Sequence, residues 1–285
     1  MSADLFRGLF DDASLFPPAS LPMAEAVRGH LRHQTGWYSD MSGPFVCAST
    51  RIGELGVALT AAGIAELDLA VVLPGGADLD TAVDAVFSDP RLRLRAVELP
   101  IATSADPLAA VTEAAAALDR TPLAGAAAFI EVPASQLTTD AVRVIAGHRY
   151  LAKVRTGGTA PEAFPDERTL ATCLAALVAE RQPFKCTAGL HHAIRHTAAD
   201  TGFEHHGFLN VLLAVATALT SEHIEKVTAE LADPAAGRVA AKVSELDADT
   251  VRAVRELFTS FGTCSTDEPV TDLVTLGLIG AGHGG

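Results

Sequence analysis

Short apolar runs alternate with longer amphipathic segments along the chain from residue 44 onward. Apolar runs of about four to eight residues bounded by Gly or Pro are typical of buried strands, and apolar positions spaced by three and four residues are typical of helices. The predicted strands cover residues 45–49, 67–73, 94–99, 126–132, 150–155, 184–187 and 238–243. The predicted helices cover residues 52–62, 79–87, 107–118, 139–147, 166–180, 208–231 and 248–260. Residues suited to N-cap positions precede four of these helices, namely Asp78, Asp106, Thr138 and Asp247.

This repetition predicts an α/β protein with a (β/α)8 barrel of the TIM type, which typically needs about 250 residues. An open parallel α/β sheet is the alternative. Such a sheet usually carries a G-x-G-x-x-G turn after its first strand, whereas this chain has Ser-Thr-Arg-Ile-Gly-Glu at residues 49–54. The eighth strand is expected at residues 258–264 or at residues 271–278, but each of these segments fits a helix or a loop equally well.

The pattern contains no internal linker and predicts one domain. Residues 1–43, which include Pro17, Pro18 and the lone Trp37, are expected to form an N-terminal extension that packs on the barrel. Residues 44–279 are expected to form the barrel, which is the catalytic domain. Residues 280–285 are rich in glycine and are expected to form a flexible tail.

Composition limits the classes of partner. The chain has 285 residues, of which 49% are hydrophobic, and a formal charge of −14. This charge disfavours binding to nucleic acid or to an anionic membrane surface, and the chain has no apolar run of the roughly 18 residues that a membrane span needs. The four cysteines form no C-x-x-C pair, and the N-terminus lacks a signal-peptide pattern, so we expect a cytoplasmic protein. A small-molecule substrate is expected, and homo-oligomerisation is left open.

Charged residues interrupt four successive predicted strands near their C-terminal ends. They are Glu98, Glu131, Lys153 and Lys185. Parallel strands are buried on both faces and are almost continuously apolar, so we expect these side chains to meet at the catalytic end of the barrel. The alternative is that they form structural ion pairs or extend into water at the strand ends.

The two lysines predict carbonyl chemistry. A lysine beside another cation in a desolvated site loses proton affinity and becomes a nucleophile or base. Lys153 or Lys185 is thus expected to form a Schiff base or to stabilise an enolate, with Glu98 and Glu131 as proton carriers or lysine orienters. Arg155 and the turns that follow the two lysine strands are expected to bind a phosphate or carboxylate, unless their glycines only shape tight turns. The residues of these turns are Thr156, Gly157, Gly158, Thr187 and Gly189.

Five of the ten histidines lie within residues 191–206. His191 and His192 come soonest after the strand and are candidate acids or bases. His192 and His196 are spaced i, i+4, which on a helix predicts a site for zinc or another divalent metal, but the glutamate of an H-E-x-x-H pattern is missing. Asn210 is expected either to cap the following helix or to reach the substrate.

Together these features predict a metal-independent, cofactor-free barrel enzyme of bacterial metabolic type. It is expected to be a lyase (aldolase) or an isomerase that acts on a small anionic carbonyl compound through its lysines. The first alternative is a metal-dependent hydrolase that uses the histidines of residues 191–206. The second is a noncatalytic protein that binds an anionic metabolite in a cationic pocket.

Overall fold

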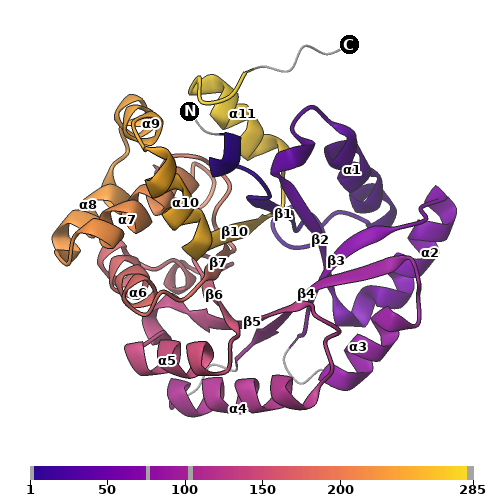
Figure 1. The fold of residues 1–285 in the computed structure, drawn as a ribbon. Coiled ribbons are helices and arrows are strands. Elements are labelled where there is room, and N and C mark those ends of the chain that lie inside the picture. Colours follow the sequence, from indigo (N-terminus) through magenta and orange to yellow (C-terminus); the bar gives the residue numbers. More distant parts are fainter. Residues whose placement is uncertain (1–2, 75–77, 102–104, 281–285) are drawn as a thin grey trace.

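The computed structural model describes residues 3–74, 78–101 and 105–280. Eight parallel strands close into a (β/α)8 TIM-type barrel in the order β1-β10-β7-β6-β5-β4-β3-β2 (Figure 1), which confirms the predicted fold class. Their bounds are Phe10–Asp12 (β1), Ser42–Ala48 (β2), Leu67–Val72 (β3), Leu92–Pro100 (β4), Ala127–Pro133 (β5), Leu151–Arg155 (β6), Phe184–Thr187 (β7) and Phe258–Thr263 (β10).

Helices surround this barrel (Figure 1). The α-helices are Met23–Thr35 (α1), Ile52–Ala62 (α2), Leu79–Phe87 (α3), Pro107–Arg120 (α4), Thr139–Gly147 (α5), Glu167–Ala179 (α6), Phe208–Thr220 (α7), Ile224–Ala232 (α8), Ala236–Ser244 (α9), Ala248–Leu257 (α10) and Asp267–Thr275 (α11). Short 3₁₀ helices cover Ala3–Leu5, Ser39–Met41, Ser49–Arg51, Ala134–Gln136 and Pro161–Ala163. None of the helices in the described ranges is long and apolar enough to cross a membrane.

The predicted N-caps are confirmed. The side chains of Asp78, Asp106, Thr138 and Asp247 each accept a hydrogen bond from the backbone N–H three residues later. Each bond satisfies one of the N–H groups that a helix start leaves without an intrahelical partner. The helix starts were therefore predictable, because capping depends on residues that are close in the chain.

The prediction that residues 1–43 form an extension outside the barrel is wrong. This segment supplies strand β1, which pairs with β10 and β2 and closes the barrel, and it also supplies α1. The strand escaped prediction because it has only three residues, two of which are aspartates. Strands average about five to six residues and are poor in Asp. Of the predicted tail, residues 281–285 lie outside the described residues.

Two further elements differ from prediction. The segment 238–243 was expected to be a strand but lies within α9, where Val239, Ala240 and Val243 are buried at helical spacing. The eighth strand is β10, which confirms the first of the two predicted positions, whereas the second position falls mainly in α11. The predicted helix 208–231 is two helices, because the backbone at Ser221 is extended and ends α7.

The barrel interior has an apolar floor. Val46, Ala70, Ala96 and Phe129 pack together there, separately from the larger core that joins the strands to the helices. Phe129 has the largest side chain of these four residues. Nζ of Lys185, in the charged layer above, lies over its ring.

Strand β1 closes the barrel, so its buried side chain should contribute measurably to the free energy of unfolding. Phe10 is fully buried, and its ring centre lies 5.4 Å from that of Phe261 and 5.8 Å from that of Phe208. We expect Phe10→Ala to lower the free energy of unfolding by about 3–5 kcal/mol, as measured by urea denaturation. Phe87→Ala is the control, because Phe87 is 47% exposed and should cost only about 0.5 kcal/mol. Equal losses in the two variants would contradict this role for β1.

Candidate active site

A cavity of about 660 Å³ opens at the end of the barrel where the strands finish. Glu98, Glu131, Lys153 and Lys185 all line it. They come from the successive strands β4, β5, β6 and β7, and Glu131, Lys153 and Lys185 are directly paired in register. The predicted convergence of the four charged side chains is therefore present, at the end of a TIM-type barrel that holds active sites in enzymes of this fold.

Glu98 joins the two lysines. Its Oε2 lies 2.5 Å from Nζ of Lys153, and its Oε1 lies 2.5 Å from Nζ of Lys185. Lys153 also contacts Oε2 of Glu131 at 2.8 Å. Nζ of Lys185 lies 5.4 Å from the centre of the Phe129 ring, whose face favours a cation. One carboxylate thus fixes both ammonium groups above the apolar floor.

Asp11 on β1 completes this network and was missed by the sequence analysis. Its carboxylate forms an ion pair with Lys185 and accepts a hydrogen bond of 2.9 Å from the hydroxyl of Ser260 on β10. Asp11 is only 3% exposed. The only sequence signal was the pair Asp11-Asp12, which directly follows the apolar residues Leu9 and Phe10. Two apolar residues are too few to predict a strand, so this signal becomes recognisable only when the barrel lacks one strand.

The pKa values of the three acids are shifted in different directions, because burial and pairing with cations oppose each other. Burial alone would raise the pKa of Glu98, but the charges of Lys153 and Lys185 outweigh it and lower the pKa to about 2. Burial likewise opposes ionisation of Glu131, yet Lys153 and Arg155 hold its pKa below the ordinary value. At Asp11 burial prevails over the attraction of Lys185, and the pKa is raised. Asp11 is therefore the acid of the network that most readily keeps a proton.

The expectation that neighbouring lysines depress each other's proton affinity is wrong for Lys185. Burial by itself lowers the pKa of this lysine, but Asp11 and Glu98 more than compensate and raise it above the ordinary value. The two ammonium groups do not act on each other alone, because the carboxylate of Glu98 lies between them in the folded chain. Lys185 is consequently held as a cation at neutral pH.

Arg155 stands at the edge of the cavity. Its Nε and one terminal nitrogen lie 2.9 and 2.5 Å from the same oxygen of Glu131, while its side chain remains 42% exposed. Gly158, Thr187 and Gly189 line the cavity with it. A guanidinium that is oriented by Glu131 and still open to the cavity can bind a carboxylate or phosphate.

Two of the predicted substrate-binding turn residues have structural roles instead. Thr156 is fully buried and donates its hydroxyl to the carbonyl of Ala188 at 2.5 Å, which joins the two turns. At Gly157 a Cβ atom would lie 2.7 Å from the Cα of Gly189, so the close approach of the turns requires glycine. Neither residue lines the cavity.

Asn210 neither caps a helix nor reaches the cavity. Its Oδ1 accepts a hydrogen bond from the backbone of Arg195, and its Nδ2 donates to the carbonyls of Glu230 and Asp233. The side chain is fully buried in the first turn of α7. It connects the segment before α7 to the end of α8, and we withdraw it from the candidate substrate contacts.

His191 lies in the cavity wall next to an acid and a thiol. Its Nδ1 is 3.6 Å from Sγ of Cys264 and 3.4 Å from Oε2 of Glu268. Burial alone would lower the pKa of His191, but Cys264 and Glu268 raise it to about 9. This imidazole is therefore protonated at neutral pH and can act as an acid rather than as a base.

His192 and His196 also line the cavity but do not lie on a helix. Their ring centres are 4.8 Å apart, His192 contacts Asp272 at 3.1 Å, and His196 bonds to the carbonyl of Ile194 at 3.1 Å. In the part of the chain that the structure describes, no three His, Cys, Asp or Glu side chains are grouped as metal ligands. The helical geometry that motivated the zinc alternative is thus not present.

Comparisons with protein-family models, with curated proteins and with solved structures found no match to this chain.

The charge on Glu98 should make stability depend on pH. Glu98→Gln leaves two buried ammonium groups short of a carboxylate, so we expect a loss of about 3–5 kcal/mol at neutral pH. The folded pKa of about 2 lies below the ordinary 4.5; the stabilisation by the charge is therefore complete above pH 4.5 and disappears as the pH falls toward 2. Urea denaturation at neutral pH and at several lower values should show the gap between the two proteins narrowing below 4.5.

Glu113→Gln is the control for this measurement. Glu113 is exposed on α4, and its replacement should change stability by only about 0.5 kcal/mol. A gap between wild type and Glu98→Gln that stays constant or widens below pH 4.5 would refute the assignment of an ionised Glu98.

Proposed function

We propose that this protein is a lyase (aldolase) or isomerase that acts on a small anionic carbonyl compound through a Schiff base on Lys153. One observation carries the proposal. Two lysines from adjacent strands share the carboxylate of Glu98 at the bottom of an open cavity, directly above the apolar floor. Burial of so many charges is costly, and perturbed titratable groups in a cleft are characteristic of catalytic sites.

The choice between the lysines follows from how their carboxylates are shared. Both partners of Lys153 contact a second cation, since Glu98 also pairs with Lys185 and Glu131 with Arg155. Lys185 in contrast has Asp11, whose other hydrogen bond comes from the neutral Ser260, and its pKa is raised. A nucleophile must be an uncharged amine, so we assign attack to Lys153 and the role of proton donor to the protonated Lys185.

The acids and cations supply the proton transfers. Ionised Glu131 takes a proton from Lys153, whose amine then attacks the carbonyl carbon; transfer of a proton from this nitrogen to the carbonyl oxygen gives a carbinolamine. A proton from Lys185 carries the hydroxyl away as water and leaves the iminium ion. The iminium withdraws electrons from the adjacent bond. Either a proton on the adjacent carbon, or the hydroxyl proton of a fragment that leaves as a carbonyl compound, then passes to the neutral amine of Lys185, and the electron pair of the broken bond moves to nitrogen as an enamine. Reversal of these steps restores the free lysine.

The remaining residues hold the substrate. Arg155 binds its carboxylate or phosphate, and His191 donates a proton at the cavity wall. The proposed steps use only side chains of this chain, without metal or cofactor. Other TIM-type barrels likewise take their catalytic groups from the ends of several strands.

Borohydride reduction tests the Schiff base directly. Incubation with pyruvate or other small keto acids and aldehydes, followed by borohydride, should add the mass of the reduced adduct to the protein. Peptide mapping of the wild type should place this mass on Lys153, and Lys153→Met should abolish it. Lys226 is exposed on α8, so Lys226→Met is the control and should label normally. Mass on Lys185, on a surface lysine, or on no lysine across a broad panel would refute the assignment.

The role of Arg155 predicts a dependence on substrate charge. Arg155→Met removes hydrogen bonds to a charged group, each worth about 1.5–3 kcal/mol. We expect the pyruvate concentration for half-maximal trapping to rise about 10- to 100-fold, while trapping of the uncharged acetone changes little. Equal losses with both compounds would show that Arg155 supports the site through Glu131 rather than binding the anion.

A further inference from the structure

Five aromatic or imidazole rings form a continuous row along one wall of the cavity. Successive ring centres lie 4.8, 5.1, 4.6 and 5.4 Å apart. All five side chains line the cavity above the lysines. We call this row the ring wall, and its members in order are His192, His196, His205, Phe164 and Phe203. The proposed carbonyl chemistry uses none of them.

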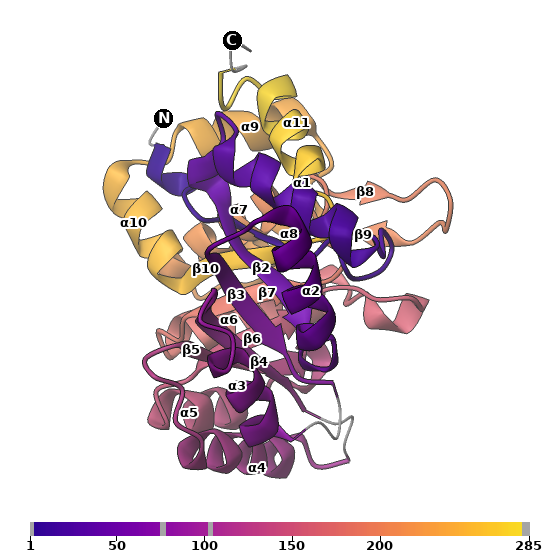
Figure 2. The same ribbon diagram turned by 90° about the vertical axis from the view of Figure 1, so that its right-hand side faces the viewer.

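The ring wall is built from elements that lie outside the barrel. The antiparallel hairpin of His196–Thr197 (β8) and Glu204–His205 (β9) projects from the body of the molecule beside the strand ends (Figure 2). It carries His196, Phe203 and His205, whereas Phe164 comes from the segment between β6 and α6. Two separate insertions therefore meet at the contact between Phe164 and Phe203.

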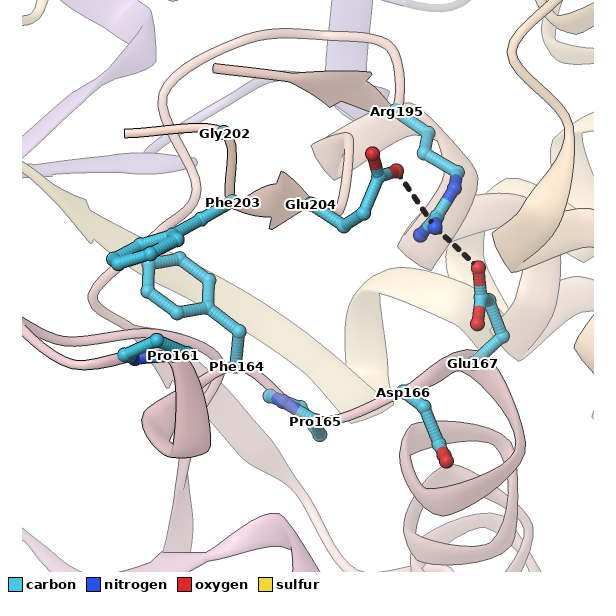
Figure 3. Close-up of a pocket in the computed structure, with 9 residues that line it drawn as sticks. All are labelled: Pro161, Phe164, Pro165, Asp166, Glu167, Arg195, Gly202, Phe203 and Glu204. Carbon is cyan, nitrogen blue, oxygen red and sulfur yellow. Dashed lines mark hydrogen bonds and ion pairs between the residues drawn. The ribbon is translucent and has the colours of Figure 1, made fainter. Parts of the chain in front are cut away.

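An arginine fixes these insertions to each other. Arg195 forms ion pairs with Glu204 of the hairpin, at 2.9 Å, and with Glu167 in the first turn of α6 (Figure 3). A second cavity of about 300 Å³ lies beside this bridge and is also lined by Phe164 and Phe203. The two phenyl rings thus stand between the cavities with their positions set before any ligand binds, which lowers the cost of binding.

Two imidazoles of the wall, those of His196 and His205, are uncharged hydrogen-bond acceptors. Nδ1 of His196 bonds to the carbonyl of Ile194, and Nδ1 of His205 bonds to the carbonyl of Gly189, each at 3.1 Å. A carbonyl only accepts, so we assign the proton to Nδ1, which leaves Nε2 as an acceptor. Burial lowers the pKa of both rings, and they are therefore neutral at neutral pH.

The cavity is larger than a small carbonyl compound requires. Its volume of about 660 Å³ is in the range of sites for drug-sized ligands, roughly 300–1,000 Å³. The charged groups lie at its floor, whereas Phe16, Pro17 and Pro18 add apolar surface to its lining. Asp200, in the loop of the β8–β9 hairpin, also lines the cavity, and its carboxylate disfavours a second anionic group there. The upper part therefore suits an uncharged ring.

We propose that the substrate carries, besides its carbonyl and anionic group, a flat ring with an N–H or O–H donor that packs against the ring wall. The carbonyl end of this substrate rests on the proposed function; the ring end rests on the wall alone. Aromatic faces and edges attract one another beyond the area that they bury, by about 0.5–1.5 kcal/mol. A saturated ring of the same size lacks this attraction, and the donor would bond to Nε2 of His196 or His205.

The test compares two carboxylates without a carbonyl group that can form a Schiff base. Titration of phenylacetate and of cyclohexylacetate by ligand-observed NMR should show about three- to tenfold tighter binding of the aromatic compound. Phe164→Leu keeps an apolar side chain and should remove this preference. Phe87→Leu is the matched control, because Phe87 is exposed on α3 away from the cavity lining, and it should keep the preference.

The outcomes separate this inference from the proposed function. Equal affinities of the two compounds for the wild type, or a preference that survives Phe164→Leu, overturn the ring wall as a substrate site. The wild-type comparison decides the first point even if the variant does not fold. Aromatic preference together with failed borohydride trapping supports the ring wall and overturns the Schiff base alone.

Discussion

The site depends on the single carboxylate of Glu98, which binds a lysine through each of its oxygens inside the barrel. Removing ions from water costs several kcal/mol each, and here three carboxylates, Asp11, Glu98 and Glu131, are balanced by Lys153, Lys185 and Arg155. Closure of the barrel brings these groups together. Several of these ion pairs join strands that are not neighbours, such as β4 with β7 and β1 with β7, so they depend on the closed shape of the barrel.

The arrangement separates two tasks in one cavity. The strand ends hold the charged groups at the bottom of this cavity, where the pKa of Asp11 is raised and the pKa values of Glu98 and Glu131 are lowered. This division is the usual basis for distinct acid and base roles. The loops after β6 and β7 form the upper wall with neutral rings. In the function proposed here, the barrel carries the chemistry and its insertions select the substrate.

Local patterns were sufficient for most of the barrel. The strands β2 to β7 and the capped helix starts depend on apolar runs and on side chains three residues from the bond that they make. Elements that depend on partners distant in the chain were not predicted correctly. Strand β1 is short and acidic, and it is a strand only because β2 and β10 lie on either side of it. The segment 238–243 fitted a strand by composition, but its burial follows a helix.

The sequence by itself determined that Glu98, Glu131, Lys153 and Lys185 would meet, because the C-terminal ends of parallel barrel strands all lie at the same end of the barrel. Only the tertiary structure decided which groups keep their protons. Lys185 is bound to Asp11, which is 174 residues away in the chain, and the energy of two charges depends on their distance in space and on the surrounding medium. The ring wall is likewise decided only by the tertiary structure, since Phe164 and His205 become neighbours only when the two insertions fold against each other.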